Sequence, residues 1–163
     1  MRQFKIIAAI DEKRGLGKDN SIPWRVQRDV KWFKTLTTTT QSNSTCNACI
    51  MGRKTWESLP ENYQPLPDRL NIVISRQENY TVPEDVILVS SLDAALELLD
   101  SEELNESIES IFLVGGAELY KEGVTHSCCS EIILTRIWGD FDCDCHFPEF
   151  SKDEFKGIYC SNI

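Results

Sequence analysis

Short apolar runs alternate with single helix-forming stretches along this chain, and that alternation most restricts what it can fold into. Phe4–Ile10, Ile72–Ile74 and Ile111–Val114 are rich in apolar and β-branched residues, as strands buried on both faces are. Between such runs lie stretches with helical spacing, the first of them over residues 26–36. One helix between successive strands is typical of an α/β fold with a largely parallel sheet.

The expected elements follow in a regular order, and Ser91 is expected to cap the third helix. Loops are expected over residues 11–23, 37–45 and 60–68, without an internal repeat or an interdomain linker. A chain of 163 residues is most simply one domain, here residues 1–163. We expect strands at Phe4–Ile10, Ala48–Met51, Leu70–Ile74, Val86–Val89, Ile111–Val114 and Glu131–Trp138, and helices over residues 26–36, 54–59, 92–99 and 117–121.

Charge and hydropathy exclude several classes of function. The chain carries 17 basic and 26 acidic residues, a net charge of -9. That balance argues against a general binder of nucleic acid or of an anionic membrane, because both need basic surfaces. No apolar run approaches the roughly 20 residues of a membrane span, and the N-terminus does not resemble a signal peptide. A cytoplasmic location is therefore expected.

The seven cysteines are expected to be reduced thiols. Their number is odd, and a chain of this length can form a core without disulfides. Cys143-Asp144-Cys145-His146 could in principle hold a metal ion, but it lacks the paired spacing of structural zinc sites. Small buried or half-buried thiols without a metal are the favoured interpretation.

The first quarter of the chain holds the pattern most suggestive of chemistry. A glycine-containing loop ends in Ile22-Pro23-Trp24, and Asp29 then opens a helix that should otherwise face apolar surroundings. A carboxylate in such a place is costly unless a cation or a hydrogen-bond donor meets it. Asp29 is therefore either a site residue or a solvated acid at a helix start, and the pattern alone leaves both open.

Three junctions of strand, turn and helix could bind a nucleotide. The segment 51–55, Met-Gly-Arg-Lys-Thr, places two cations and a hydroxyl at a helix start, where free N–H groups favour anions. Ser75-Arg76 repeats the hydroxyl and the guanidinium, and Gly115-Gly116 would let the backbone approach a pyrophosphate. None is a Walker A loop or a Rossmann fingerprint, so an ordinary turn is an equal alternative for each. Two basic junctions on successive strands suggest a ligand with an isolated phosphate, such as the 2′-phosphate of NADP.

Together these motifs resemble the dihydrofolate reductase family, of the type encoded in chromosomes rather than on plasmids. The resemblance implies a three-layer α/β domain with a mostly parallel central sheet flanked by helices. The matching segments occur in the family's order and are Ile7–Ala9, Gly15–Gly17, Ile22–Trp24, Asp29, Phe33, Met51–Ser58, Pro65–Arg69, Asn71–Arg76, Val114–Tyr120 and Leu134–Ile137.

The resemblance implies a reaction and a set of site residues. The reaction is NADPH-dependent reduction of 7,8-dihydrofolate to 5,6,7,8-tetrahydrofolate, with hydride transfer to pterin C6 and protonation at N5, which makes such enzymes part of one-carbon metabolism and targets of antifolates. Catalysis would fall to Asp29, Trp24 and Thr135, and no metal is implied. The segment from Arg14 to Trp24, named the lid loop, would close over the nicotinamide. The substrate contacts implied are Ile7, Val30, Phe33, Lys34, Leu66, Arg69 and Val114; the cofactor contacts are Ala9, Leu16, Gly17, Asn20, Ser21, Ile22, Gly52, Arg53, Lys54, Thr55, Ser75, Arg76, Gln77, Gly115, Gly116, Ala117, Glu118, Leu119 and Tyr120.

Alternatives and departures accompany the resemblance. A related pyrimidine or pterin reductase, or a truncated non-catalytic paralogue that binds NADPH or folate, would share much of the pattern. The chain could act as a monomer or as part of a fusion with thymidylate synthase. Family members continue past a segment like Phe147-Pro148 with two antiparallel strands, so we expect one or both to be missing here. Asp68 stands in place of a frequent glycine and is expected to alter the turn before Arg69.

Overall fold

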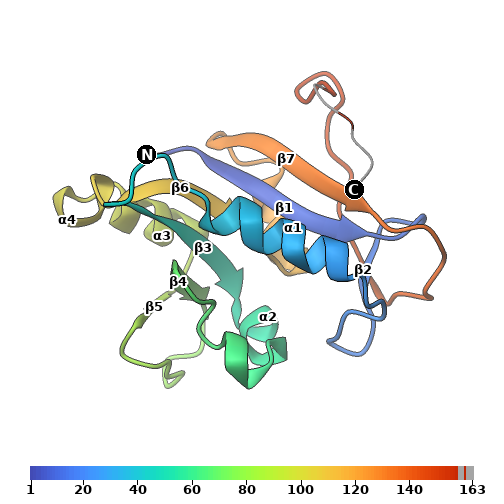
Figure 1. The fold of residues 1–163 in the computed structure, drawn as a ribbon, viewed down its shortest axis with the longest axis horizontal. Helices are drawn as coiled ribbons and strands as arrows, with labels where there is room; N and C mark the ends of the chain where they lie inside the picture. Colours follow the sequence, from blue (N-terminus) through green and yellow to red (C-terminus); the bar gives the residue numbers. More distant parts are fainter. Residues whose placement is uncertain (158–159, 161–163) are drawn as a thin grey trace.

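A six-stranded sheet forms the centre of the molecule (Figure 1). The computed structural model describes residues 1–157 and residue 160. The strand order is β5-β4-β3-β6-β1-β7, and every pairing in this sheet is parallel. The expected α/β class is thereby confirmed. The strands are β1 (Phe4–Ile10), β3 (Cys46–Gly52), β4 (Arg69–Ile74), β5 (Val86–Val89), β6 (Ile108–Leu113) and β7 (Cys129–Arg136).

Helices cover both faces of the sheet and give the expected three layers. In Figure 1, α1 lies across one face, and α3 lies behind the sheet. The helices are α1 (Gln27–Thr38), α2 (Arg53–Ser58), α3 (Leu92–Leu99), α4 (Glu102–Asn105) and α5 (Ala117–Gly123), with a 3₁₀ turn at Glu61–Tyr63. Ser91 caps α3 as expected, because its hydroxyl accepts a hydrogen bond from the N–H of Ala94 at 3.1 Å.

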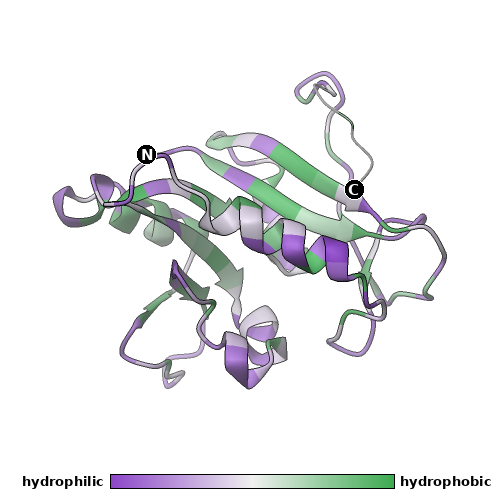
Figure 2. Cartoon of the chain, viewed as in Figure 1, coloured by the Kyte–Doolittle hydropathy of each residue, from purple (hydrophilic) through white to green (hydrophobic). Residues whose placement is uncertain are grey.

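Alternating side chains of the strands supply two cores, one on each face. Ile6 and Ala8 of β1 join a cluster that includes the apolar stripe of α3, whereas Ile7 joins a cluster on the side of Phe33 in α1. This period of two follows from the pleat of the strand. The strands are accordingly apolar along nearly their whole length, as Figure 2 shows for the centre of the sheet.

The first helix extends further than the sequence pattern predicts. It runs to Thr38, so the expected loop over residues 37–45 begins two residues too early. Thr37 is completely buried; its hydroxyl donates to the carbonyl of Phe33 at 2.8 Å and accepts from Nη1 of Arg69, also at 2.8 Å. This tertiary contact holds a β-branched residue in the helix, where its intrinsic propensity is low.

Two elements of a small antiparallel sheet were not expected. β2 (Gly15–Gly17) pairs with β8 (Cys145–His146), which joins the lid loop to a distant part of the chain. The helix α4 was also unexpected. The last long strand lies two residues earlier than expected, because β7 runs from Cys129 to Arg136 and Trp138 beyond it is 84% exposed.

Other sequence expectations concern thiols, metals and membranes. All seven cysteines are free thiols. Within residues 1–157 and 160, no three His, Cys, Asp or Glu side chains lie close enough together to hold a metal ion. The same residues contain no helix of the length and hydropathy needed to cross a membrane.

Candidate active site

Asp29 lies in the first turn of α1 and faces the sheet at β7. Its carboxyl is half-buried, and this burial raises its pKa, while a hydrogen bond from the Thr135 hydroxyl acts in the opposite direction. Thr135 is held there by the parallel pairing of β7 with β1, in which it lies opposite Ala9. The structure therefore brings together the acid and the hydroxyl that the sequence resemblance pairs, and the acid is partly desolvated.

Trp24, at the end of the lid loop, carries a buried polar group without a partner. The residue is 7% exposed, and its indole N–H finds no hydrogen-bond acceptor among the described residues. The ring packs edge-on against Phe141, with the ring centres 5.3 Å apart. Buried N–H groups are nearly always paired in folded proteins, so this donor is suited to a water molecule or a ligand.

Four of the expected substrate contacts lie in one apolar cluster. Ile7 and Leu66 are buried within it, and Phe33 and Val114 pack against it from α1 and from the end of β6. Val30 in α1 and Ile22 in the lid loop are 59% and 64% exposed. A well-packed apolar floor with uncovered apolar side chains near it is what a slot for a flat heterocycle requires.

Arg69 begins β4 and lies beside the same cluster. Its Nε donates to the carbonyl of Pro67 and its Nη1 to the Thr37 hydroxyl, both at 2.8 Å, and the guanidinium lies 5.9 Å from the ring centre of Phe33. Within the described residues its Nη2 has no hydrogen-bond partner. Burial lowers the pKa of this arginine, which stays a cation suited to bind a carboxylate.

The turn before Arg69 differs from the expectation. Asp68 adopts a left-handed conformation, with φ of 63°. Aspartate tolerates this region better than most residues do. The turn therefore has a glycine-like geometry, contrary to the expectation that Asp68 alters it.

The glycine junctions at the ends of β3 and β6 lie against each other. The N–H of Gly52 donates to the carbonyl of Gly115 at 2.8 Å, and the Gly115–Gly116 peptide bond is cis. A Cβ atom on Gly116 would lie 3.0 Å from the hydroxyl oxygen of Thr55. A side chain on Gly116 would therefore press on Thr55, whereas a Cβ atom on Gly52 would lie at an ordinary 3.8 Å from Gly115. The polar main-chain groups of both junctions lie close to the start of α2. Such a place suits the pyrophosphate of a dinucleotide.

Cationic and hydroxyl side chains surround these junctions, with one restriction. Lys54 and Arg76 are exposed, and the Ser75 hydroxyl accepts from the N–H of Gln77 at 3.2 Å. Arg53, however, donates to both carboxylate oxygens of Glu57, at 3.0 Å each. Its Nη1 group is thus paired within the protein, and the expected contact of Arg53 with the cofactor stays a prediction.

The remaining expected cofactor residues fall into two groups. On the lid loop, the Asn20 side chain donates to the carbonyl of Lys54 at 3.4 Å, which brings the loop to the start of α2. On α5, Leu119 is buried in the core and Glu118 is exposed. Tyr120 is also buried, and its hydroxyl donates to the carbonyl of Ile7 at 2.8 Å. Leu16 of the lid loop packs against the core. Lys34, which is an expected substrate contact, is exposed on α1.

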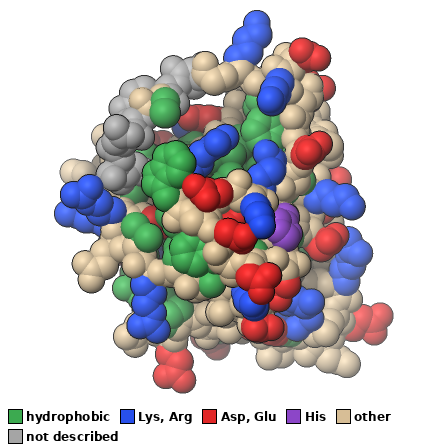
Figure 3. Space-filling model, turned by 90° about the vertical axis from the view of Figure 1, so that its right-hand side faces the viewer, with side chains coloured by type: hydrophobic (Ala, Val, Ile, Leu, Met, Phe, Trp, Pro, Cys, Tyr) green, Lys and Arg blue, Asp and Glu red, His purple; other side chains and the backbone are tan. Residues whose placement is uncertain are grey.

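Sequence reasoning missed the loop that supports the lid loop, residues 138–144. Lys13 and Lys18 form ion pairs with Asp140 and Asp142 across the two loops. Figure 3 shows this end of the molecule, where acidic and basic side chains alternate over the surface. The alternating acids at 140, 142 and 144 were the available signal. The buried Asp11, which accepts hydrogen bonds from Gly15 and Phe141, was missed as well.

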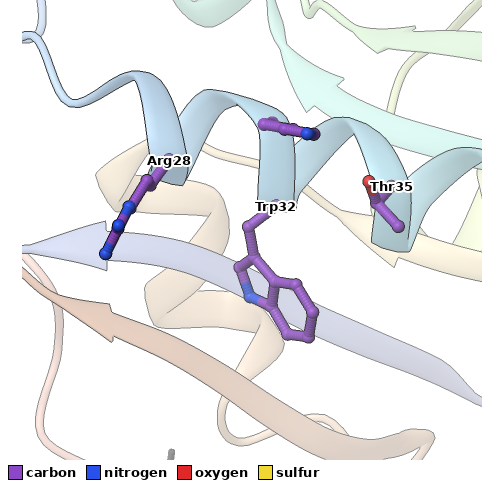
Figure 4. A pocket seen from close by; sticks show the side chains of 4 residues that line it. Arg28, Trp32 and Thr35 are labelled. Carbon is purple, nitrogen blue, oxygen red and sulfur yellow. The ribbon is translucent and has the colours of Figure 1, made fainter. Parts of the chain in front are cut away.

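Two hollows are described, and neither is lined by the apolar cluster that contains Ile7 and Leu66. One of about 210 Å³ is lined by a face of α1 that carries Arg28, Trp32 and Thr35 (Figure 4). The other, about 570 Å³, lies between α5 and β8 and includes Glu118 and Asp144. Since Ala117 and Glu118 line it, the second hollow borders the expected cofactor side of the site.

The apolar cluster thus adjoins the glycine junctions through Val114, Asp29 is half-buried beside β7, and the lid loop reaches the start of α2 through Asn20. The class of protein defined by this fold and site is an α/β oxidoreductase that aligns a nicotinamide nucleotide with a heterocyclic substrate. The sequence model of the family described as "Dihydrofolate reductase" matches residues 3–162. The chain belongs to the dihydrofolate reductase family, and with it to the enzymes that reduce dihydrofolate with NADPH.

Individual relatives agree with the family match. A putative dihydrofolate reductase of Caenorhabditis elegans is 42% identical over 94% of this chain and 82% of its own length. The solved structure of the Schistosoma mansoni dihydrofolate reductase superposes with a TM-score of 0.85 at 38% identity, covering 98% of this chain and 87% of that one. The fold and the family are thus similar over nearly the whole chain.

The expectation that terminal strands of the family are missing is not supported. The family match continues to residue 162. In the described part of the chain, the residues after β8 fold back on the core: Phe147 is buried, and Phe150 packs against it with ring centres 6.3 Å apart. The guanidinium of Arg14 lies 5.5 Å from the ring centre of Phe150 and fixes this segment to the lid loop.

Some relatives are much longer than this chain. The bifunctional dihydrofolate reductase-thymidylate synthase 2 of Arabidopsis thaliana is 37% identical over 98% of this chain, which spans only 28% of that protein. The match to such proteins therefore concerns their reductase portion.

Proposed function

We propose that residues 1–163 act as a single dihydrofolate reductase domain, and that Asp29, Trp24 and Thr135 form its catalytic group. One observation carries this assignment: the half-buried Asp29 carboxyl meets the Thr135 hydroxyl where β7 lies beside β1. An acid in that environment can bind the amino group and the ring N–H of a pterin through both carboxylate oxygens. A solvated acid at a helix start would show no such desolvation.

The protein's task in this reaction is to align two ligands and to favour protonation of the substrate. NADPH, when bound, supplies the hydride. Asp29 holds the pterin and raises the proton affinity of its ring, and the unpaired indole N–H of Trp24 holds a water molecule that can deliver the proton to N5. The lid loop excludes other water, which strengthens these polar interactions.

The substrate would lie on the apolar cluster with its tail toward Arg69. Ile7, Phe33 and Leu66 contact the flat rings, and Val30 and Lys34 lie nearer to solvent. The Nη2 group of Arg69 would bind the α-carboxylate of the glutamate tail. This pairing favours a folate over the smaller substrate of a pyrimidine reductase, because only the folate has the carboxylate.

The cofactor would lie along the glycine junctions. Gly52, Gly115 and Gly116 leave space for the pyrophosphate, and Thr55 with the N–H groups of α2 would bind it. Lys54, Ser75 and Arg76 would hold the 2′-phosphate and so favour NADPH over NADH. Glu118 carries a negative charge and contributes nothing to the binding of that phosphate.

The proposal also covers the cellular location of the enzyme and whether it needs a partner chain. We place the enzyme in the cytoplasm, where NADPH and folates are available to it. The domain would bind its substrate without a partner chain, whether alone or fused to thymidylate synthase as in the Arabidopsis relative.

The test is the rate of NADPH oxidation with dihydrofolate for the wild type and for Asp29→Asn. Wild-type turnover, with a loss of roughly 10²-fold or more in the variant at neutral pH, would support the assignment, since this is the usual contribution of a general acid–base group. Binding of NADPH without turnover in the wild type would instead favour a non-catalytic paralogue. Equal rates in both proteins would remove Asp29 from the mechanism.

A further inference from the structure

Asp11, the residue directly after β1, connects the lid loop to the loop of residues 138–144. It is 3% exposed. Its Oδ1 accepts from the N–H groups of Lys13 and Gly15, at 2.8 and 2.6 Å. Its Oδ2 accepts from the N–H of Phe141 at 3.3 Å and from the thiol of Cys143 at 3.6 Å. Each carboxylate oxygen thus binds one of the two loops.

The space around this carboxylate is filled. A Cβ atom on Gly15 would lie 2.7 Å from Oδ2 of Asp11 and 2.6 Å from Cβ of Cys143. The glycine is therefore needed for the two loops to come together on the carboxylate. Backbone pairing of Gly15 with His146, and of Gly17 with Cys145, extends the contact beyond Asp11.

Phe141, which donates one of these hydrogen bonds, packs on the tryptophan proposed to be catalytic. The Phe141 ring meets Trp24 edge-on, at 5.3 Å between centres and an angle of 63°. Trp24 is the residue whose buried indole N–H has no partner among the described residues. A path of direct contacts therefore runs from Asp11 through Phe141 to Trp24.

We propose that Asp11 is a positioning residue of the active site: by binding both loops it fixes Phe141, and through Phe141 it fixes the indole of Trp24. This inference rests on the function proposed above for Trp24. We assign Asp11 no role as an acid or a base, because within the described residues its carboxylate is bound by residues 13–15 and 141–143 alone.

Only a carboxylate satisfies this arrangement. It offers two oxygens to four donors, three of them backbone N–H groups whose positions are fixed. An asparagine has the same size, but one of its two ends is an NH₂ group that would face an N–H donor. Asp11→Asn should therefore release one loop while leaving the volume unchanged.

The matched control is Asp142→Asn. Asp142 lies in the same loop and also binds the lid loop, through Lys18 at 2.7 Å, but its side chain is 92% exposed. Although it follows Phe141 in the chain, its side chain forms no hydrogen bond with Trp24 or Phe141 among the described residues. A second variant, Phe141→Leu, interrupts the path from its other end without changing a charge.

The experiment combines ¹⁹F NMR of protein labelled with 5-fluorotryptophan and single-turnover hydride transfer. The Trp24 signal is identified by its loss in Trp24→Phe. We expect Asp11→Asn to shift or broaden the Trp24 signal and to slow hydride transfer by about 10- to 100-fold, the range for small misplacement of a catalytic group, with KM for dihydrofolate within about twofold. Phe141→Leu should slow hydride transfer similarly, and the double variant should be no slower than the slower single variant.

Several outcomes would overturn the proposal. An unchanged Trp24 signal in Asp11→Asn, or an equal effect of Asp142→Asn, would do so. If Asp11→Asn does not fold, the test rests on Phe141→Leu. A wild-type rate of hydride transfer in Phe141→Leu would refute the proposal that Phe141 fixes Trp24. Failure of the proposed function is distinguishable, because the wild type would then lack turnover while the NMR comparison of Trp24 still tests the positioning.

Discussion

The hydroxyl of Tyr120 donates a 2.8 Å hydrogen bond to the carbonyl of Ile7, and this bond ties α5 to the central strand β1. Both residues are buried, and burial raises the pKa of Tyr120 so that its hydroxyl stays a donor. Ile7 belongs to the apolar cluster proposed to hold the substrate, and Tyr120 follows the glycine junction at the end of β6. The substrate side and the cofactor side of the site therefore share one rigid contact.

Removal of this contact should affect stability more than chemistry. We expect Tyr120→Phe to lower the free energy of unfolding by about 1–2 kcal/mol, because it leaves a buried carbonyl without its donor. Denaturant unfolding measures this difference. Tyr63→Phe is the control, because Tyr63 is 45% exposed, and it should change stability little. Equal effects of the two substitutions would contradict the role of the Tyr120 hydrogen bond.

Asp29 should reduce the stability of the ligand-free protein at neutral pH. Burial raises its pKa above the ordinary 3.8, so the folded state favours the protonated form. The contribution of Asp29 to the free energy of unfolding is fully favourable below pH 3.8, where the carboxyl is protonated in both states. This contribution is lost as the pH rises through the higher pKa of the folded state. Asp29→Asn stays neutral, so we expect it to unfold at a higher temperature than the wild type at pH 7 and to lose that advantage on acidification.

Thermal unfolding without ligands at neutral and acidic pH measures this effect. The same variant should be the one that loses activity, which is the usual conflict between stability and a desolvated catalytic group. A variant that is less stable than the wild type at pH 7 would show that the interaction with Thr135 outweighs the burial of the charge.

The sequence was sufficient for the fold class and for the apolar faces of β1 and α1. The period of two in β1 predicts that Ile7 faces away from Ile6 and Ala8, and the helical spacing of α1 places Phe33 on the same side as Ile7. Each of these patterns depends only on residues close together in the sequence. In the structure, Ile7 and Phe33 lie in one apolar cluster and Ile6 and Ala8 in the other.

Contacts between distant segments could not be predicted in this way. β2 is a three-residue strand that contains two glycines, and its pairing with β8 joins positions about 130 residues apart. Nothing near Asp11 in the sequence indicates that its partners include Phe141 and Cys143. The hydrogen bond of Thr37 to Arg69 likewise depends on tertiary structure, and it extends α1 beyond its propensity.

Arg69 should control affinity for the substrate tail. We expect Arg69→Lys to raise KM for dihydrofolate by about 10- to 100-fold, because an ammonium group cannot form the paired hydrogen bonds of a guanidinium with a carboxylate. A substrate with the pterin but without the glutamate tail is the control, and its KM should change by less than about threefold. Steady-state kinetics with both substrates distinguishes a lost tail contact from a general disturbance of β4, which would raise both values.

Glu57 should limit the preference for NADPH, because it holds Arg53 away from the cofactor. Both oxygens of Glu57 accept from Nη1 of Arg53 at 3.0 Å, and the guanidinium also lies 5.9 Å from the ring centre of Tyr80. The ion pair is partly exposed and worth at most about 1 kcal/mol.

Glu57→Gln should therefore lower KM for NADPH by up to about fivefold. It should leave KM for NADH unchanged, since NADH has no 2′-phosphate for the released guanidinium to bind. Arg53→Ala should leave KM for NADPH close to the wild-type value, because Glu57 already holds this arginine, and should make KM insensitive to Glu57→Gln. If both cofactors respond equally to Glu57→Gln, the carboxylate acts through general charge rather than through Arg53.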